Sequence, residues 1–213
     1  MFTMDSLLYK FTVWFMRLAY VNILWIVLTI TGLGVFGFFP STVAMFAVVR
    51  HWIRGDTEIP ILITFWSHYK TNFMKTNMLG MVMTLLGLMI YWNLLFFISM
   101  NNQIGAMLFY LTIALALVYF VVVSFIIPVY VHYDLKVVGY LKYAFIISLS
   151  YPHHALYIGF SSIVMYYATL FFPVLFLFFS GSFLSLLIMR FAYVVFERVE
   201  RKNSSKEVVA AEV

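Results

Sequence analysis

The stretch from Leu18 to Val49 holds 32 residues without a single Asp, Glu, Lys or Arg. As one helix it would be about 48 Å long, at roughly 1.5 Å per residue. The hydrocarbon core of a bilayer is only about 30 Å thick. The stretch is therefore too apolar to lie in water and too long for one upright span, so the chain must turn within it.

Glycine and proline locate that turn. Gly32, Gly34 and Gly37 weaken a helix where they cluster. Pro40 suits the first turn of a new helix, where its missing N–H costs nothing. The pattern predicts a tight hairpin made of helix 10–31, turn 32–39 and a short second helix, 40–54.

The rest of the chain has the same apolar character. It is 65% hydrophobic and 10% charged, with a mean hydropathy of +1.01, whereas charged residues make up about a quarter of a soluble domain. Further spans are predicted at 76–100, 106–133, 155–177 and 182–198. The expected fold class is an all-α polytopic membrane protein, with a single domain (1–200) of six transmembrane helices. The second and sixth helices are short, and a polar cytoplasmic tail follows over 201–213.

The basic residues orient these helices. With the N-terminus inside, the outer turns are 32–39, 101–105 and 178–182, and none of them contains Lys or Arg. Lys and Arg are enriched in the cytoplasmic loops of membrane proteins. Six spans with both termini in the cytoplasm place every basic residue on the inner side or at an inner helix end: Lys10, Arg17, Arg50, Arg54, Lys70, Lys75, Lys136, Lys142, Arg190, Arg198, Arg201, Lys202 and Lys206.

Two segments between the spans are amphipathic. Residues 62–75 place Phe65, Trp66, Tyr69 and Phe73 on one helical face and polar residues on the other. Residues 137–151 precede the fifth span in the same way. Both segments are expected to lie in the plane of the membrane, on its cytoplasmic face.

A series of motif positions follows between residues 20 and 73. They are Asn22, Leu24-Trp25, Gly32, Pro40-x-x-x-Ala44, Arg50-x-Trp52-x-Arg54-Gly55, Phe65 and Asn72-Phe73. This run resembles the YesL-type family of uncharacterised bacterial integral membrane proteins, and the length and hydropathy of the whole chain fit that family. In this comparison Gly32, Pro40 and Ala44 are the hairpin and helix-start positions.

The resemblance carries an expectation about function. Members of the YesL-type family commonly lie beside genes for complex-carbohydrate uptake and breakdown in Gram-positive bacteria. That context implies a plasma-membrane protein working alongside a sugar ABC transporter. The resemblance supplies no catalytic, cofactor or metal residues.

Four polar side chains within the predicted spans are singled out as functional candidates: Arg17, Asn22, Asn93 and Arg190. A charged residue inside a span is by default a functional candidate. The alternatives for each arginine are that it extends to the inner surface, or that it pairs with an acid such as Glu197 or Asp134. Each asparagine can hydrogen-bond between helices or bind a ligand, and the first is favoured.

The densest group of inner-face residues is Arg50-His51-Trp52-Ile53-Arg54-Gly55. It can anchor the protein, with tryptophan at the headgroup level and arginines on lipid phosphates, or it can dock a partner. The inner-face candidates for either role are Arg50, Trp52, Arg54, Gly55, Phe65, Trp66 and Asn72.

Motifs for enzymatic chemistry are missing from the sequence. It has no Cys, no Ser-His-Asp arrangement, no phosphate-binding glycine loop and no zinc-ligand spacing, and His153-His154 point to different faces. We expect a non-enzymatic accessory of carbohydrate uptake that contacts the phospholipid bilayer and sugar ABC permease subunits, without cofactor, metal or nucleic acid. The alternatives are a small transporter or channel, alone or as a homo-oligomer, and a structural or lipid-organising protein.

Overall fold

The computed structural model describes residues 7–100 and 102–211, and the regular structure in these two ranges is entirely helical. The helices, in chain order, are α1 (Leu7–Thr31), α2 (Val35–Ile53), α3 (Ile61–Ser99), α4 (Gln103–His132), α5 (Val137–Ser150), α6 (Pro152–Phe171), α7 (Pro173–Phe178) and α8 (Ser180–Ala211).

Helices α1 and α2 form the predicted hairpin, but its turn is much shorter than expected. It occupies residues 32–34, where Leu33 and Gly34 take positive φ values of 61° and 72°. The amide of Gly34 donates to the carbonyl of Thr29 at 2.9 Å, which closes the end of α1. The predicted turn over 32–39 is therefore wrong in extent, because two left-handed residues are enough to reverse the chain.

Pro40 lies inside α2 instead of starting it, so the predicted helix 40–54 begins five residues too late. A proline within a helix leaves the carbonyl four residues earlier without its usual donor. Here that carbonyl belongs to Phe36, and it accepts a hydrogen bond from Asn77 Nδ2 of α3 at 2.9 Å. The side chain of Asn77 thus replaces the missing amide and the helix runs through the proline.

Helix α3 is continuous over 39 residues, about 58 Å at roughly 1.5 Å per residue. The segment 62–75, expected as an amphipathic helix in the plane of the membrane before the third span, is the first part of this same helix, and its orientation to the membrane stays a prediction. Its apolar face packs against α2, where Phe65 and Tyr69 are buried. The Tyr69 hydroxyl also donates to the carbonyl oxygen of Leu28 at 3.2 Å. Contacts with α1 and α2 therefore take the place that headgroups were expected to fill.

The core surrounds α2. Twelve of its residues are buried, and it packs against α1, α3, α4 and α8. Helix α5, the second predicted amphipathic segment, packs against the same core. Its buried residues there are Tyr140, Ala144 and Ile147. Both amphipathic segments thus belong to the packed body of the protein.

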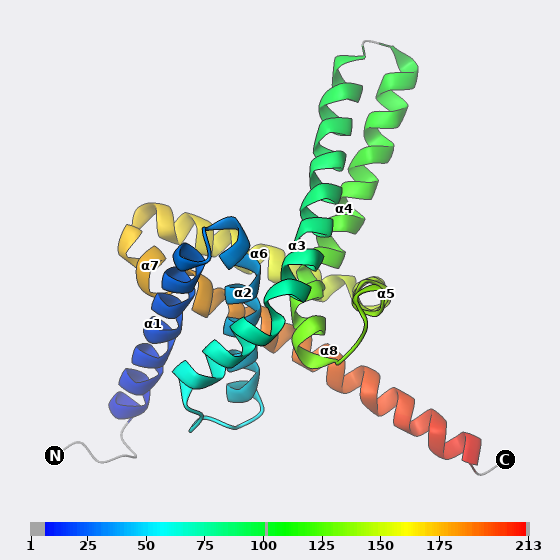
Figure 1. The fold of residues 1–213 in the computed structure, drawn as a ribbon. Helices are drawn as coiled ribbons and strands as arrows, with labels where there is room; N and C mark the ends of the chain where they lie inside the picture. Colours follow the sequence, from blue (N-terminus) through cyan, green and yellow to red (C-terminus); the bar gives the residue numbers. More distant parts are fainter. Residues whose placement is uncertain (1–6, 101, 212–213) are drawn as a thin grey trace.

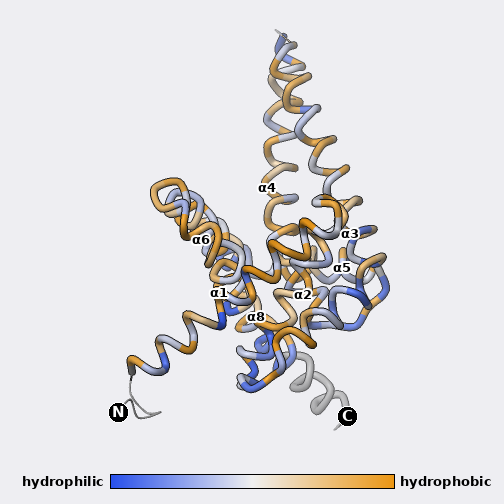
Figure 2. The backbone as a smooth tube through the Cα atoms, turned by 60° about the vertical axis from the view of Figure 1, so that its left-hand side comes forward, coloured by the Kyte–Doolittle hydropathy of each residue, from blue (hydrophilic) through white to orange (hydrophobic). Residues whose placement is uncertain are grey.

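The second half of α3 and the first half of α4 rise away from this body (Figure 1). We call this part, residues 81–99 and 103–120, the projecting hairpin. Tyr119 holds its two helices together by donating to the Met83 carbonyl at 2.7 Å. Its surface is predominantly hydrophobic (Figure 2) and exposes, among others, Met81, Leu85, Met89, Trp92, Phe96, Met107, Tyr110, Leu111 and Leu115.

The last third of the chain departs most from expectation. The span predicted over 155–177 is interrupted at Phe172, because Pro173 cannot continue the ladder of α6 and instead starts α7. The turn predicted at 178–182 is confined to Phe179, and Gly181 lies inside α8. Helix α8 then runs back beside α6 and continues as helix through Ala211.

Within residues 7–100 and 102–211, five helices are long and apolar enough to cross a membrane: α1, α2, α3, α4 and α6. The chain is thus an all-α polytopic membrane protein, as predicted. The expected sixth span, 182–198, lies within α8, which is not among these five. It carries three charged residues, Arg190, Glu197 and Arg198.

Candidate functional site

A polar cavity of about 330 Å³ lies where the C-terminal ends of α2 and α4 meet the first half of α3 and the start of α5. We call it the Arg50 cavity. Its lining comprises Val43, Ala47, Arg50, His68, Asn72, Lys75, Tyr130, Val131, His132, Tyr133, Asp134 and Tyr140. The residues come from four helices and from the segment between α4 and α5, so only the folded chain assembles it.

Arg50 lies in the last turn of α2, where a positive charge is favoured by the partial negative charge of the helix end. Its Nη2 donates to the carbonyl oxygen of His132 at 3.3 Å. The Nε atom is buried and has no hydrogen-bond partner among the described residues. Ion pairs in the described part of the chain do not include Arg50, so its charge faces the cavity unneutralised by direct contact.

The opposite wall is held by a chain of hydrogen bonds. The Tyr130 hydroxyl donates to Asn72 Oδ1 at 3.0 Å, and Asn72 Nδ2 donates to the carbonyl of His68 at 3.0 Å. The ring of Tyr140 lies 4.6 Å from that of Tyr130. The Tyr140 hydroxyl accepts from the Leu135 amide at 3.1 Å, which leaves its own O–H available as a donor.

His132 connects the cavity to α8. Its Nε2 lies 2.9 Å from Glu200 Oε1, and its ring lies 4.5 Å from that of Phe196. Its Nδ1 is buried without a partner among the described residues. Next to it, burial raises the pKa of Tyr133 to about 12, with smaller contributions from Glu200 and Tyr143. The Tyr133 hydroxyl is thus neutral at physiological pH.

The cavity is biased toward positive charge and hydrogen-bond donors. Arg50 and Lys75 contribute two cations, and Asp134 is the single acid among its lining residues. Groups of three or more His, Asp or Glu that could hold a metal ion do not occur in the described parts of the chain. Chemically, the arrangement is suited to hold an acceptor-rich or negatively charged group.

Two of the seven inner-face candidates, Arg50 and Asn72, line this cavity together. Arg54 is exposed just beyond the end of α2, and Gly55 takes a φ of 98° in the following turn. Trp66 is half exposed on the surface of α3. These positions leave room for the surface roles expected of them.

Trp52 and Phe65 cannot act as surface anchors, and this part of the prediction is wrong. Trp52 is 4% exposed and Phe65 is fully buried. The Trp52 ring packs edge-on against Trp14 at 5.5 Å, in the core between α1 and α2. Both are residues of the hydrophobic core, whereas the sequence pattern predicted them at the inner surface.

Asn22 lies fully buried and spans the break between α7 and α8. Its Nδ2 donates to the carbonyls of Phe176 and Leu177 at 3.1 and 2.8 Å. Its Oδ1 accepts from the amides of Gly181 and Ser182 at 2.9 and 3.0 Å. All of its hydrogen-bonding capacity is used in joining α1 to this break, so its role is structural.

Asn93 has no such partners. Its Nδ2 donates to the carbonyl of Met89 in its own helix at 2.8 Å, and Oδ1 accepts nothing from the described residues. The favoured expectation of a bond between helices is therefore not met within the chain. Asn93 instead lines an open apolar groove of about 850 Å³ along the projecting hairpin.

The two arginines expected within spans reach the surface. Arg17 Nη2 lies 3.3 Å from Glu58 Oε1, in the segment between α2 and α3. The suggested partners Glu197 and Asp134 are therefore wrong for Arg17. Arg190 is exposed and lines a second pocket with Trp52 and Ile53 at the end of α2, and its extension to the inner membrane surface stays a prediction.

Gly32, Pro40 and Ala44, the expected hairpin and helix-start positions, lie where helices pack closely together. A Cβ atom on Gly32 would lie 2.6 Å from the Tyr69 hydroxyl, so only glycine allows α3 to come this close. Pro40 and Ala44 are buried in α2, where Ala44 has no exposed surface.

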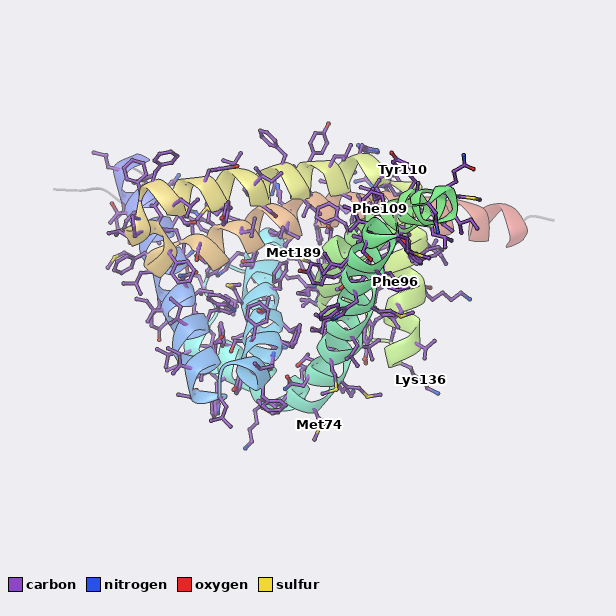
Figure 3. The ribbon with its side chains drawn as sticks, turned by 90° about the horizontal axis from the view of Figure 1, so that it is seen from above. Met74, Phe96, Phe109, Tyr110, Lys136 and Met189 are labelled. Atoms are coloured by element: carbon purple, nitrogen blue, oxygen red, sulfur yellow. The ribbon has the colours of Figure 1, made fainter. Side chains whose placement is uncertain are left out.

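Several residues of the Arg50 cavity were missed at the sequence level. Tyr130, His132 and Tyr133 follow the apolar run of α4 in the sequence VYVHYD, and this cluster of polar groups at the end of a span was the available signal. Lys75 was noted only for its charge. The view from above in Figure 3 places Lys136 at the edge of the molecule, Met189 within the body, and Phe96, Phe109 and Tyr110 on the projecting hairpin.

Comparisons with known proteins agree on one family. Residues 18–94 match the family model described as "Protein of unknown function, DUF624". The chain is 36% identical to the uncharacterised protein YteU of Bacillus subtilis over 201 residues, covering 93% of this chain and 89% of YteU.

It is also 30% identical to the uncharacterised proteins YesL and YesV of the same organism. These matches cover 92% and 88% of this chain, and 93% and 90% of the two relatives. No solved structure matches the chain.

Proposed function

The chain belongs to the YesL-type family of membrane proteins, matched by DUF624, and we propose that it is a non-enzymatic accessory of carbohydrate uptake. In this proposal it lies in the bacterial plasma membrane with both termini in the cytoplasm, which requires the 182–198 part of α8 to cross the membrane in addition to the five long apolar helices. It acts by packing its projecting hairpin against the permease subunits of a sugar ABC transporter.

The observation that supports this proposal is the unpaired Asn93 side chain. Polar groups in lipid are costly unless they find a hydrogen-bond partner. Asn93 Oδ1 accepts no hydrogen bond from the described residues, although it lies within one of the long apolar helices. A donor from a helix of another protein would satisfy it, and such bonds between helices are worth roughly 1 kcal/mol in membranes.

The surroundings of Asn93 favour a helix as its partner. The groove that it lines is apolar, running between α3 and α4 down to α5, and it includes Met89, Leu111 and Thr112. The Thr112 hydroxyl is satisfied by the Leu108 carbonyl at 2.8 Å. The groove thus presents one unsatisfied acceptor within an apolar surface, and helices in membranes associate by packing around such groups.

The identity of the partner rests on the family resemblance, which implies a role beside sugar uptake. The orientation rests on charge. The turn 32–34 and residues 100 and 102 at the hairpin tip carry no Lys or Arg, whereas residues 50–58 and 134–142 carry four. The positive-inside rule then places these basic segments in the cytoplasm.

Affinity purification in a gentle detergent, followed by mass spectrometry, tests the proposal. We expect sugar permease subunits to be recovered with the unmodified chain and lost with Asn93→Leu, which removes the polar atoms at similar volume. Thr112→Val is the matched control, since it lies in the same groove but its hydroxyl is already satisfied. Recovery of this chain alone in repeated preparations would refute the accessory role.

The rival function, transport by the protein itself, is separated by a second measurement. Purified protein in liposomes should give no sugar flux above that of empty liposomes if it is an accessory. Flux from the pure protein, together with the absence of permease subunits from the purification, would assign transport or conduction to the chain itself.

A further inference from the structure

We propose that the Arg50 cavity binds a phosphate group, carried by a phospholipid headgroup or by a free phosphate anion. This goes beyond the accessory function and does not depend on it, because the cavity lies in the packed body and the groove lies on the projecting hairpin.

The Arg50 guanidinium has hydrogen-bond donors that the described residues leave unused. It carries several N–H donors in a fixed fork and cannot lose its charge in a protein. Among the described residues it makes one hydrogen bond, to the carbonyl of His132, and no ion pair. Buried donors are normally satisfied, so the buried and unpartnered Nε indicates that an acceptor from outside the chain completes the site.

Further donors converge on the same space. Lys75 contributes a second cation, and the Tyr140 O–H is free to donate because its oxygen accepts from Leu135. The Tyr130 hydroxyl is committed to Asn72 and fixes that wall in place. A fork of guanidinium donors with a lysine beside it matches the several acceptor oxygens of a phosphate.

Size and charge are consistent with this ligand. A volume of about 330 Å³ is roughly ten times the ~30 Å³ that one water occupies in the liquid, which admits a phosphate with a few attached atoms. Asp134 also lines the cavity, so one of the two cations is needed to balance it. The other leaves a net attraction for an anion, and binding is expected to need both Arg50 and Lys75.

The test measures thermal unfolding of the purified protein in detergent, followed by the fluorescence of its tryptophans. Inorganic phosphate is compared with chloride at equal ionic strength. The second arm adds phosphatidylglycerol to the detergent micelles and compares it with diacylglycerol, which has the same acyl chains but no phosphate. We expect a rise in Tm with at least one phosphate source. Phosphate alone identifies a free anion, and phosphatidylglycerol alone identifies a headgroup.

Three variants tie the effect to the cavity. Arg50→Gln is expected to weaken the apparent phosphate affinity by about tenfold or more, the usual scale for losing a charge-assisted hydrogen bond. Lys75→Gln, on an exposed side chain that lines the cavity, should weaken it several-fold and covers the case in which Arg50→Gln fails to fold. Lys70→Gln is the control: it removes an exposed charge outside the cavity and should leave the affinity within about twofold.

Two results would overturn the proposal. The first is an equal Tm in phosphate and chloride together with an equal Tm with phosphatidylglycerol and with diacylglycerol. The second is an equal loss of stabilisation in Lys70→Gln and in the cavity variants, because that would mean attraction to the general surface charge and not to the cavity.

Discussion

Asn77 Nδ2 lies 2.9 Å from the carbonyl oxygen of Phe36, the carbonyl that Pro40 leaves without a donor in its own helix. One side chain of α3 thus repairs the ladder of α2 and fixes how the two helices pack. It also holds α3 beside the turn of the α1–α2 hairpin, so that the rest of α3 extends past this turn (Figure 1).

This relationship predicts a coupling between positions 40 and 77. Asn77→Ala should lower the free energy of unfolding by about 1–2 kcal/mol, because the Phe36 carbonyl loses its donor. In a Pro40→Ala background the helix supplies its own amide at position 40, so the same change should cost much less. Thermal unfolding of the four proteins of this double-mutant cycle measures the difference. An equal cost of Asn77→Ala in both backgrounds would contradict the repair role.

Asn22 and Asn93 should differ strongly in their contribution to stability. Asn22→Ala should destabilise the protein by about 2–4 kcal/mol, since it leaves buried amides and carbonyls at the α7–α8 break unsatisfied. Asn93→Ala should change stability by less than about 0.5 kcal/mol, because its one hydrogen bond is local. Thermal unfolding in detergent distinguishes them. Equal costs would mean that Asn93 also has a structural partner within the chain.

The first hairpin was predictable because its signals are local. Charge-free length requires a turn, and clustered glycines indicate where it falls. Its boundaries were not predictable, because the preference of proline for a helix start was overridden by Asn77, a donor 41 residues away from Phe36. The sequence shows that Pro40 leaves one backbone carbonyl without its usual donor. It does not show which residue of the chain supplies the replacement donor.

The amphipathic segments show a different limit. Periodicity identified the apolar face that includes Phe65 and Tyr69, but an apolar face can be covered by lipid or by another helix. In the folded chain, α2 covers the apolar face that includes Phe65 and Tyr69. The Arg50 cavity was beyond prediction for the same reason: Arg50 and His132 lie 82 residues apart, and only the crossing of α2 and α4 brings them into contact.

The glycines of the first hairpin should fail in different ways. Gly37→Ala should cost about 1–3 kcal/mol, because its new Cβ would lie 2.7 Å from the backbone oxygen of Leu28 and force the helices apart. Gly34 has open space around it but a φ of 72°. Gly34→Ala should therefore cost about 1 kcal/mol or more, and Gly34→Asn about the same, because a ψ of −85° places the residue outside the αL region that asparagine tolerates. A Gly34→Ala variant as stable as the natural protein in thermal unfolding would show that backbone conformation does not limit this position.

Labelling of introduced cysteines tests the proposed orientation, and the absence of natural cysteines makes the background clean. Phe36→Cys lies at the start of α2, where the side chain is half exposed, and Asp56→Cys lies in the exposed turn after α2. Because α2 separates them, a membrane-impermeant thiol reagent should label Phe36→Cys in intact cells and Asp56→Cys only after lysis. The physical reason is the retention of Arg50 and Arg54 on the cytoplasmic side. Labelling of both positions from one side would show that α2 does not cross the membrane.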